Sequence, residues 1–173
     1  YGNLIIELGN ISKDKTIIKE GNDAMAFAYF RKNEFRNALV FYNLSIVYNA
    51  TINKNDDLYL YTGIAKCYVA LSVCDSAIFY ADFANKCLMI DTTANAKLEV
   101  LMSYGSCYFC SQNYSRAFEC FDSSLALARQ MNEVGGDIEY LLDQLVGISK
   151  ESGDTVKLLQ YYEETVNHMS NYT

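Results

Sequence analysis

The chain has 173 residues, of which 51% are hydrophobic and 20% charged, and it contains no proline and no tryptophan. A chain of this length and composition can bury a sizeable core, which excludes wholesale disorder. Its formal charge of −7 comes from 14 basic and 21 acidic residues, so we expect no direct nucleic acid contact by this segment and no attraction to an anionic membrane surface.

Membrane and secretion signals are not visible in the sequence. No run approaches the ~18 consecutive apolar residues of a membrane-spanning helix, so we expect no membrane insertion by this segment. Residues 1–7 lack a basic stretch followed by an apolar one, which argues against a signal peptide. Because the chain also lacks an initiator methionine, it is interpreted as a piece of a longer protein, whose compartment the missing signal does not define.

Short polar breaks divide the chain into amphipathic segments, and the absence of proline permits long helices throughout. Residues 1–18 are predicted to be an N-terminal cap or a partial repeat. Four helix pairs are expected to follow, at residues 19–56, 57–95, 96–136 and 137–173, the last being a degenerate repeat or C-terminal cap. Because no linker or low-complexity segment is visible, residues 1–173 are expected to form a single domain.

Turns and caps mark the expected helix ends. Tight turns within the pairs predict antiparallel neighbours, and they are expected at residues 32–34, 72–73, 111–113 and 152–154. Polar breaks between pairs are expected at residues 53–56, 91–95 and 132–136. Asp56 and Asp57 precede a helix predicted from Leu58 to about Leu71, because carboxylates favour a helix N-terminus.

A period of 39 to 41 residues relates the pairs, as the spacing of Ala38, Ala77, Ala117 and Leu158 shows. In the first unit the pattern is Ala26, Tyr29, Phe35, Ala38, Tyr42 and Ser45, and in the third it is Gly105, Tyr108, Tyr114, Ala117, Phe121 and Ser124, at identical spacing. The second and fourth units follow it more loosely. We expect the small residues to let helices approach closely and the aromatic residues to fill the space between pairs.

This pattern resembles the tetratricopeptide repeat (TPR) family over residues 19 to about 167, most closely at residues 105–128 and 26–46. The resemblance implies an all-α fold, namely a right-handed α-solenoid of antiparallel helix pairs. The period exceeds the usual ~34 residues of the family, because no proline ends the second helices. Longer units of this kind resemble those of bacterial TPR regulators and of eukaryotic cargo and polarity adaptors.

The first helix of each pair lines the concave face in the family, so the resemblance implies a partner-binding groove there. The residues carried over to it by alignment are Asp23, Phe27, Phe30, Arg31, Tyr59, Thr62, Lys66, Met102, Ser106, Phe109, Tyr140 and Asp143. Apolar anchors beside a few charges suit a peptide or a helix of a partner protein. In the alternative interpretation, several of these side chains only pack against the next unit.

One known type of ligand is disfavoured by the same alignment. Chaperone-binding members of the family hold the carboxylate end of a peptide with Lys, Asn and Arg on this face. The aligned positions here hold Asp23, Phe27, Thr62, Lys66, Met102 and Ser106, so that clamp is absent.

No residue set predicts catalysis, and we expect no enzyme activity, no cofactor and no metal. His168 is the single histidine and lies near the C-terminus, so no His–carboxylate or Ser–His arrangement is expected elsewhere and a nucleophilic triad is excluded. Glu119 and Asp122 are interpreted as a solvated helix face. The Gly135–Gly136 pair is interpreted as a turn and not as a phosphate-binding loop.

The six cysteines lie in apolar helical patterns and are predicted to be buried structural thiols. Cys107 and Cys110 form a CxxC motif inside a helical run, without the second pair that a zinc site requires. Cysteines that look unpaired favour the cytoplasm. A periplasmic location stays open if the chain is an excised sensor segment.

Three functions are compatible with the sequence. The first is a non-catalytic protein-protein interaction scaffold that binds a peptide or helix on its concave face. The second is a ligand-sensing or regulatory TPR segment of a larger bacterial signalling or transcription-regulatory protein. The third is a structural spacer or self-association surface, and the oligomeric state is not predicted.

Overall fold

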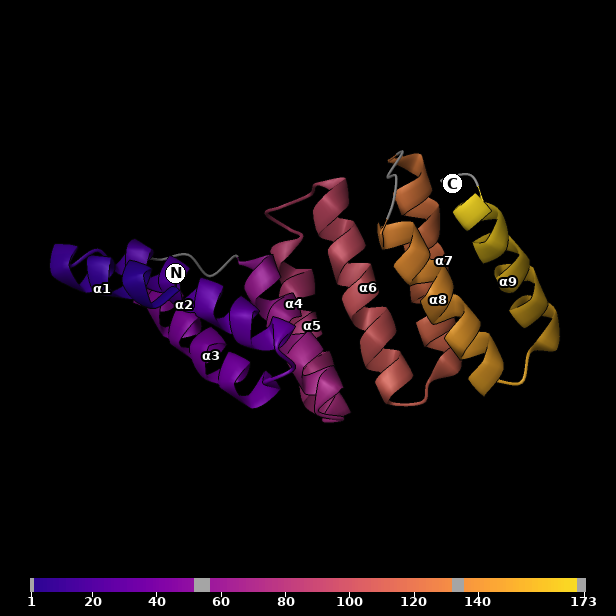
Figure 1. Cartoon of the computed structure of the whole chain (residues 1–173), viewed down its shortest axis with the longest axis horizontal. Coiled ribbons are helices and arrows are strands. Elements are labelled where there is room, and N and C mark those ends of the chain that lie inside the picture. The colour runs from indigo at the N-terminus through magenta and orange to yellow at the C-terminus, as the bar shows by residue number, and fades with distance from the viewer. Residues whose placement is uncertain (1, 52–56, 132–135, 171–173) are drawn as a thin grey trace. The chain divides into compact units, whose positions relative to one another are not determined.

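The computed structural model describes residues 2–51, 57–131 and 136–170, and within these residues the chain forms nine α-helices and no β-strand (Figure 1). The helices are α1 Gly2–Ser12, α2 Lys15–Arg31, α3 Phe35–Thr51, α4 Leu58–Ala70, α5 Cys74–Cys87, α6 Ala94–Cys110, α7 Tyr114–Gln130, α8 Gly136–Glu151 and α9 Thr155–Ser170. The all-α prediction is therefore confirmed.

The chain divides into two compact units, Tyr1–Thr92 with α1 to α5 and Thr93–Thr173 with α6 to α9. In the first unit, α1 packs against α2, α2 against α3, α3 against α4 and α4 against α5. In the second unit, α6 packs against α7, α7 against α8 and α8 against α9. Each unit is thus a stack of antiparallel helices, and Figure 1 shows α8 and α9 side by side.

Side chains cap the starts of several helices. Asp57 accepts a hydrogen bond from the backbone N–H of Leu60 at 3.1 Å, and Thr93 accepts one from Ala96 at 3.2 Å. The first of these confirms the predicted start of the helix at Leu58. The second corrects the predicted break at residues 91–95, because α6 already begins at Ala94. The break expected at residues 53–56 lies outside the described residues, as does the one expected at residues 132–136 except for Gly136, which already begins α8.

All four tight turns within the predicted pairs share one backbone conformation. Their middle residues Asn33, Ser72, Gln112 and Gly153 have φ values of 60°, 59°, 59° and 75°. At each turn the next backbone N–H donates to a carbonyl five residues earlier, as in Asn113 N to Tyr108 O at 2.8 Å. The turn between α1 and α2 repeats this arrangement, with φ 57° at Lys13 and Asp14 N donating to Gly9 O at 2.9 Å.

The alanines that mark the repeat are buried. Ala38, Ala77 and Ala117 have no exposed surface, as the small-residue pattern predicts. A Cβ atom on Gly105 would lie 2.8 Å from atoms of the Phe121 ring, so the ring packs directly on the glycine. The core of the second unit extends from there through α7 and α8 with Phe121, Leu125, Leu141, Leu142 and Leu145.

The cysteines match the prediction in part. Cys67, Cys87 and Cys107 are buried thiols, and Cys120 is a half-buried thiol. Burial raises the pKa of the Cys67 thiol to about 12, which keeps it protonated and inert. Cys74 and Cys110 are not free thiols, so the expectation of six unpaired cysteines is wrong for these two. The cysteines therefore give no support for a reducing compartment.

Candidate partner-binding surfaces

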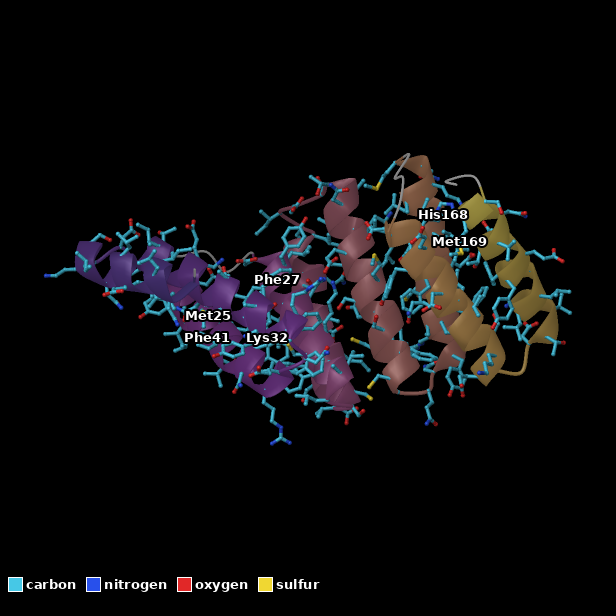
Figure 2. All side chains as sticks on the ribbon, in the orientation of Figure 1. Met25, Phe27, Lys32, Phe41, His168 and Met169 are labelled. Atoms are coloured by element: carbon cyan, nitrogen blue, oxygen red, sulfur yellow. The ribbon has the colours of Figure 1, made fainter. Side chains whose placement is uncertain are left out.

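Two aromatic side chains project into solvent from first helices in the unit Tyr1–Thr92. Phe27 on α2 is 60% exposed and Tyr59 on α4 is 56% exposed, and Figure 2 labels Phe27 on its helix. Phe27 directly follows Ala26, which is fully buried. The two neighbours differ in exposure because successive residues of a helix point in different directions. The small residue therefore faces the core while the ring faces outward.

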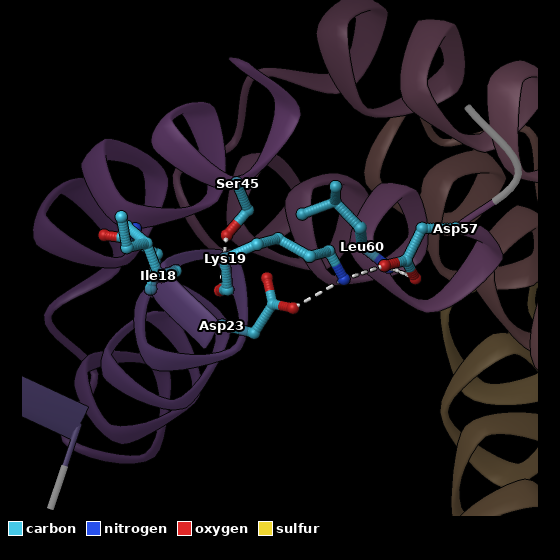
Figure 3. Close-up of polar contacts among 7 residues, drawn as sticks. Ile18, Lys19, Asp23, Ser45, Asp57 and Leu60 are labelled. Atoms are coloured by element: carbon cyan, nitrogen blue, oxygen red, sulfur yellow. Dashed lines mark hydrogen bonds and ion pairs between the residues drawn. The ribbon is translucent and has the colours of Figure 1, made fainter. Parts of the chain in front are cut away.

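A lysine joins the helices that carry these two rings (Figure 3). The Lys19 ammonium pairs with Asp23 at 2.7 Å, one turn later on α2, and with the Asp57 carboxylate at the start of α4. Ser45 on α3 donates to the Lys19 carbonyl at 3.5 Å. Asp57 also caps α4 through the Leu60 N–H. The Asp57 side chain therefore connects Lys19 of α2 to the first turn of α4.

Burial alone lowers the pKa of Lys19, but the hydrogen bonds and negative charges of Asp23 and Asp57 outweigh that effect and raise the pKa above its ordinary value. The lysine is therefore charged at neutral pH although its side chain is only 12% exposed. The bridge holds α2 and α4 by charge-assisted hydrogen bonds, which are stronger than neutral ones.

On α2, three predicted groove residues lie on one helical face. Asp23, Phe27 and Arg31 are spaced four residues apart, so they align along the helix. Arg31 is exposed and Asp23 is half-buried. An acidic group and a basic group thus flank the exposed Phe27 ring along the helix.

Two predicted groove residues of this unit face the core instead. Thr62 is 1% exposed and its hydroxyl donates to the Tyr59 carbonyl at 3.2 Å. Phe30 is half-buried and packs edge-on against Phe35, with ring centroids 5.5 Å apart. We do not retain either side chain among the proposed partner contacts. Lys66 is half-buried on α4.

In the unit Thr93–Thr173, the predicted residues are also divided between core and surface. Met102 is 9% exposed and belongs to the core cluster, and Phe109 is half-buried with its ring 5.9 Å from that of Tyr114. Asp143 is exposed, and Tyr140 is 39% exposed. The Tyr140 hydroxyl lies 3.3 Å from the Ser106 hydroxyl, which joins α8 to α6.

Sequence reasoning missed Lys19. The spacing of Lys19 and Asp23 by four residues was a visible signal for an ion pair on one helix. The contact with Asp57, 38 residues away, depends on how α2 and α4 pack, and the sequence pattern carries no direct sign of it.

Across residues 2–51, 57–131 and 136–170, no group of three or more His, Cys, Asp and Glu side chains is placed to hold a metal ion. Among the helices of the described residues, none is long and apolar enough to cross a membrane.

Comparisons with known proteins identify the fold. No protein-family model matches the sequence, and no curated protein matches it. Among solved structures, BtubC (BKLC) from P. vanneervenii is similar with a TM-score of 0.77 at 18% identity, over 92% of this chain and 66% of that one. The chain thus spans just under two thirds of the length of BtubC. TPR-like repeats described as those of a Podosopora anserina kinesin light chain are similar with a TM-score of 0.76 at 10% identity, over 99% of this chain and 84% of that one. The chain therefore has the TPR-like helical repeat fold, of the α-solenoid class.

Proposed function

We propose that this chain is a non-catalytic interaction scaffold that binds a peptide or a helix of a partner protein. The main contact is the α2/α4 face, which we define as Asp23, Phe27, Arg31 and Tyr59. The observation that carries the proposal is the exposure of Phe27 and Tyr59 on two helices that Lys19 holds together. Helical repeats commonly offer extended surfaces of this type to protein partners.

The chemistry of the α2/α4 face suits an extended or helical peptide. A large aromatic ring that is exposed to solvent contributes most to the free energy of binding when a partner covers it. Such residues dominate many interfaces. Asp23 and Arg31 lie on either side of Phe27 along α2, so a peptide with opposite charges at matching positions binds in one direction. Lys19 fixes the Asp23 carboxylate before the partner arrives, which reduces the entropy lost on binding.

In the other unit, Tyr140 and Asp143 on α8 are the proposed contacts. Tyr140 is held by the Ser106 hydroxyl and by its edge-on contact with Phe121, whose ring centroid is 6.4 Å away. Its ring is therefore presented in a fixed orientation, as a binding anchor requires.

The test selects peptides against the whole chain from a display library and measures their affinities by calorimetry. For peptides that bind the α2/α4 face, we expect the double variant Phe27→Ser, Tyr59→Ser to weaken binding by about tenfold or more, the effect of losing roughly 1.4 kcal/mol. Both rings are exposed, so circular dichroism should show an unchanged helical spectrum.

Phe79→Ser is the matched control, because Phe79 is 55% exposed but lies on α5, the second helix of its pair. This control should leave every affinity within about twofold, as is usual for a contact outside an interface. Peptides that bind the double variant as tightly as the unchanged chain would exclude the α2/α4 face as the binding surface.

A further inference from the structure

The junction at which α2 and α3 pack against α4 has a polar end. The Lys19 side chain of α2 is 12% exposed, and Asn49 of α3 is 2% exposed. Ser45 lies one turn before Asn49 on the same face of α3, has no exposed surface and donates to the Lys19 carbonyl. Figure 3 shows Lys19 extending from this contact to Asp57 at the start of α4. Polar groups are therefore buried where α2 and α3 meet the first turn of α4.

Three buried polar atoms of these helices have no hydrogen-bond partner. Within the part of the chain that the structure describes, neither the Nδ2 nor the Oδ1 atom of Asn49 has one, and the same holds for Oδ1 of Asp23. The other carboxylate oxygen of Asp23 pairs with Lys19 at 2.7 Å. A buried donor or acceptor without a partner has given up its hydrogen bonds to water and gained none in return. These atoms therefore disfavour the closed junction.

The same repeat positions in the second unit are apolar. Lys19, Asp23 and Asn49 correspond to residues 79 positions later, namely Leu98, Met102 and Ala128. All three counterparts are buried, and they belong to one core cluster with Ile138 of α8. The junction of α7 with α8 thus closes on apolar side chains at the positions where the junction of α3 with α4 closes on polar ones.

Separation of the helices has different consequences at these two internal junctions. Opening α7 from α8 exposes apolar side chains to water, which is unfavourable. Opening α3 from α4 lets water reach the amide of Asn49 and hydrates the charges of Lys19 and Asp57, which offsets part of the loss of their ion pair. The apolar cluster with Tyr42 and Ile64 holds the rest of that junction closed. Opening therefore costs less free energy at the first junction and begins at its polar end.

We propose that the junction of α2 and α3 with α4 is a hinge of the scaffold, which opens and closes while the second unit stays folded. Opening separates Phe27 on α2 from Tyr59 on α4 and so divides the α2/α4 face. A partner that covers both rings holds the hinge closed. This last consequence rests on the proposed function, whereas the opening itself does not.

A buried thiol reports the opening. Cys67 of α4 has no exposed surface and belongs to the apolar cluster that α4 shares with α2 and α3. Its alkylation by N-ethylmaleimide therefore requires the helices to separate. Mass spectrometry of peptides from the alkylated whole chain gives a separate rate for each cysteine. Cys107 of α6, which is also fully buried, is the reference in the second unit.

Variants of α2 and α3 test the hinge. Asn49→Leu should slow the alkylation of Cys67 by about tenfold, because leucine has a similar size and removes both atoms that lack partners. Asn43→Leu is the matched control, since Asn43 is exposed on the same helix, and it should leave the rate within about twofold. Lys19→Met should accelerate the alkylation by about tenfold or more, because two carboxylates lose their buried cation. The rate at Cys107 should stay the same in all three variants.

Peptides selected for the α2/α4 face provide a second measurement. A peptide that binds only the closed hinge should slow the alkylation of Cys67 by about tenfold when its concentration is about ten times its dissociation constant. A peptide that binds this face without slowing the alkylation would overturn the link between the hinge and the face. Failure to find any such peptide would count against the proposed function alone, because the Asn49→Leu result decides the hinge.

Two results would overturn the hinge itself. If Asn49→Leu leaves the alkylation of Cys67 unchanged or accelerates it, the amide does not disfavour the closed junction. If the variants change the rates at Cys67 and Cys107 in parallel, alkylation occurs through unfolding of the whole chain and not through this junction.

Discussion

Glycine residues allow α1 and α2 to pack at close range. A Cβ atom on Gly21 of α2 would lie 2.6 Å from Ile6 Cγ1 and 2.8 Å from the Ile6 backbone nitrogen. On α1, a Cβ atom on Gly9 would lie 2.8 Å from the backbone nitrogen of Ile18. Backbone atoms cannot move aside as a flexible side chain can, so these contacts fix the distance between α1 and α2.

Gly21→Ala should therefore lower the free energy of unfolding by roughly 1–3 kcal/mol, the usual cost of overpacking. Gly147→Ala is the control, because no atom lies within 4 Å of its added Cβ. Since alanine restricts the unfolded chain and favours a helix, that variant should gain about 0.5–1 kcal/mol. Urea unfolding followed by circular dichroism measures both changes. Equal stability of the two variants would contradict the packing described for α1 and α2.

Single residues were predictable where the repeat itself specifies them. The alanines at positions 38, 77 and 117 recur at fixed spacing, and all three are fully buried. The groove residues were less predictable, because alignment to a family transfers a position along the helix but not the rotation of that helix. A small rotation decides whether a side chain such as Thr62 faces the core.

At the level of the helices, a tyrosine connects α7 to α9. The Tyr161 hydroxyl donates to Asp122 at 3.1 Å, and its ring lies 6.1 Å from that of Phe118. Arg129 of α7 pairs with Glu164 of α9 beside it. Burial, together with the charge and hydrogen bond of Asp122, raises the pKa of Tyr161 to about 12, against a smaller opposing effect of Arg129.

This raised pKa predicts a loss of stability at alkaline pH. The unfolded tyrosine ionises near pH 10, while the folded one keeps its proton until about pH 12. Between these values the folded state binds more protons, so the free energy of unfolding falls as the pH rises. Tyr161→Phe should reduce that fall by roughly 1–3 kcal/mol, and it should also cost about 1 kcal/mol at pH 8 through the lost hydrogen bond.

Urea unfolding at a series of pH values from 8 to about 12 measures the effect. Tyr162→Phe is the control, because Tyr162 is exposed on the neighbouring position of α9. The control should keep the pH dependence of the unchanged chain. If Tyr161→Phe keeps it as well, the bond to Asp122 does not control the alkaline transition.

Helices and turns followed from the sequence more closely than their ends did. The tight turns contain short polar runs between amphipathic segments, a local signal, and they lie where predicted. The start of α6 does not lie where it was predicted, because residues 91–95 were interpreted as a polar break. The helix begins after Thr93, whose hydroxyl caps the Ala96 N–H. Competing caps within a few residues cannot be ranked from sequence alone.

For the molecule as a whole, each unit has its own core. The buried cluster that includes Phe121 and Leu142 draws all of its members from residues 98–161. The cluster that includes Tyr42 and Ile64 draws its buried members from residues 26–67. Neither the repeat period nor the composition predicted this division, because the spacing of the pairs is nearly uniform along the chain.

The fragment of residues 93–173 should therefore fold by itself. We expect a helical circular dichroism spectrum and a cooperative thermal transition, because its contacts join helices that are neighbours in sequence. Leu142→Ala, which removes a side chain that is 1% exposed, should destabilise the fragment by about 2–5 kcal/mol. A fragment with the spectrum of an unfolded chain would contradict an independent core.

The shared turn conformation has a consequence for how such a chain can be rearranged. At each of these turns a residue in the left-handed conformation lies between two helices, namely Asn33, Ser72, Gln112 and Gly153. The chain therefore leaves each first helix along the same path. A junction at one turn can be replaced by that at another without redirecting the following helix. The turns are therefore natural crossover points, at which recombination or protein engineering can exchange single helices among the pairs.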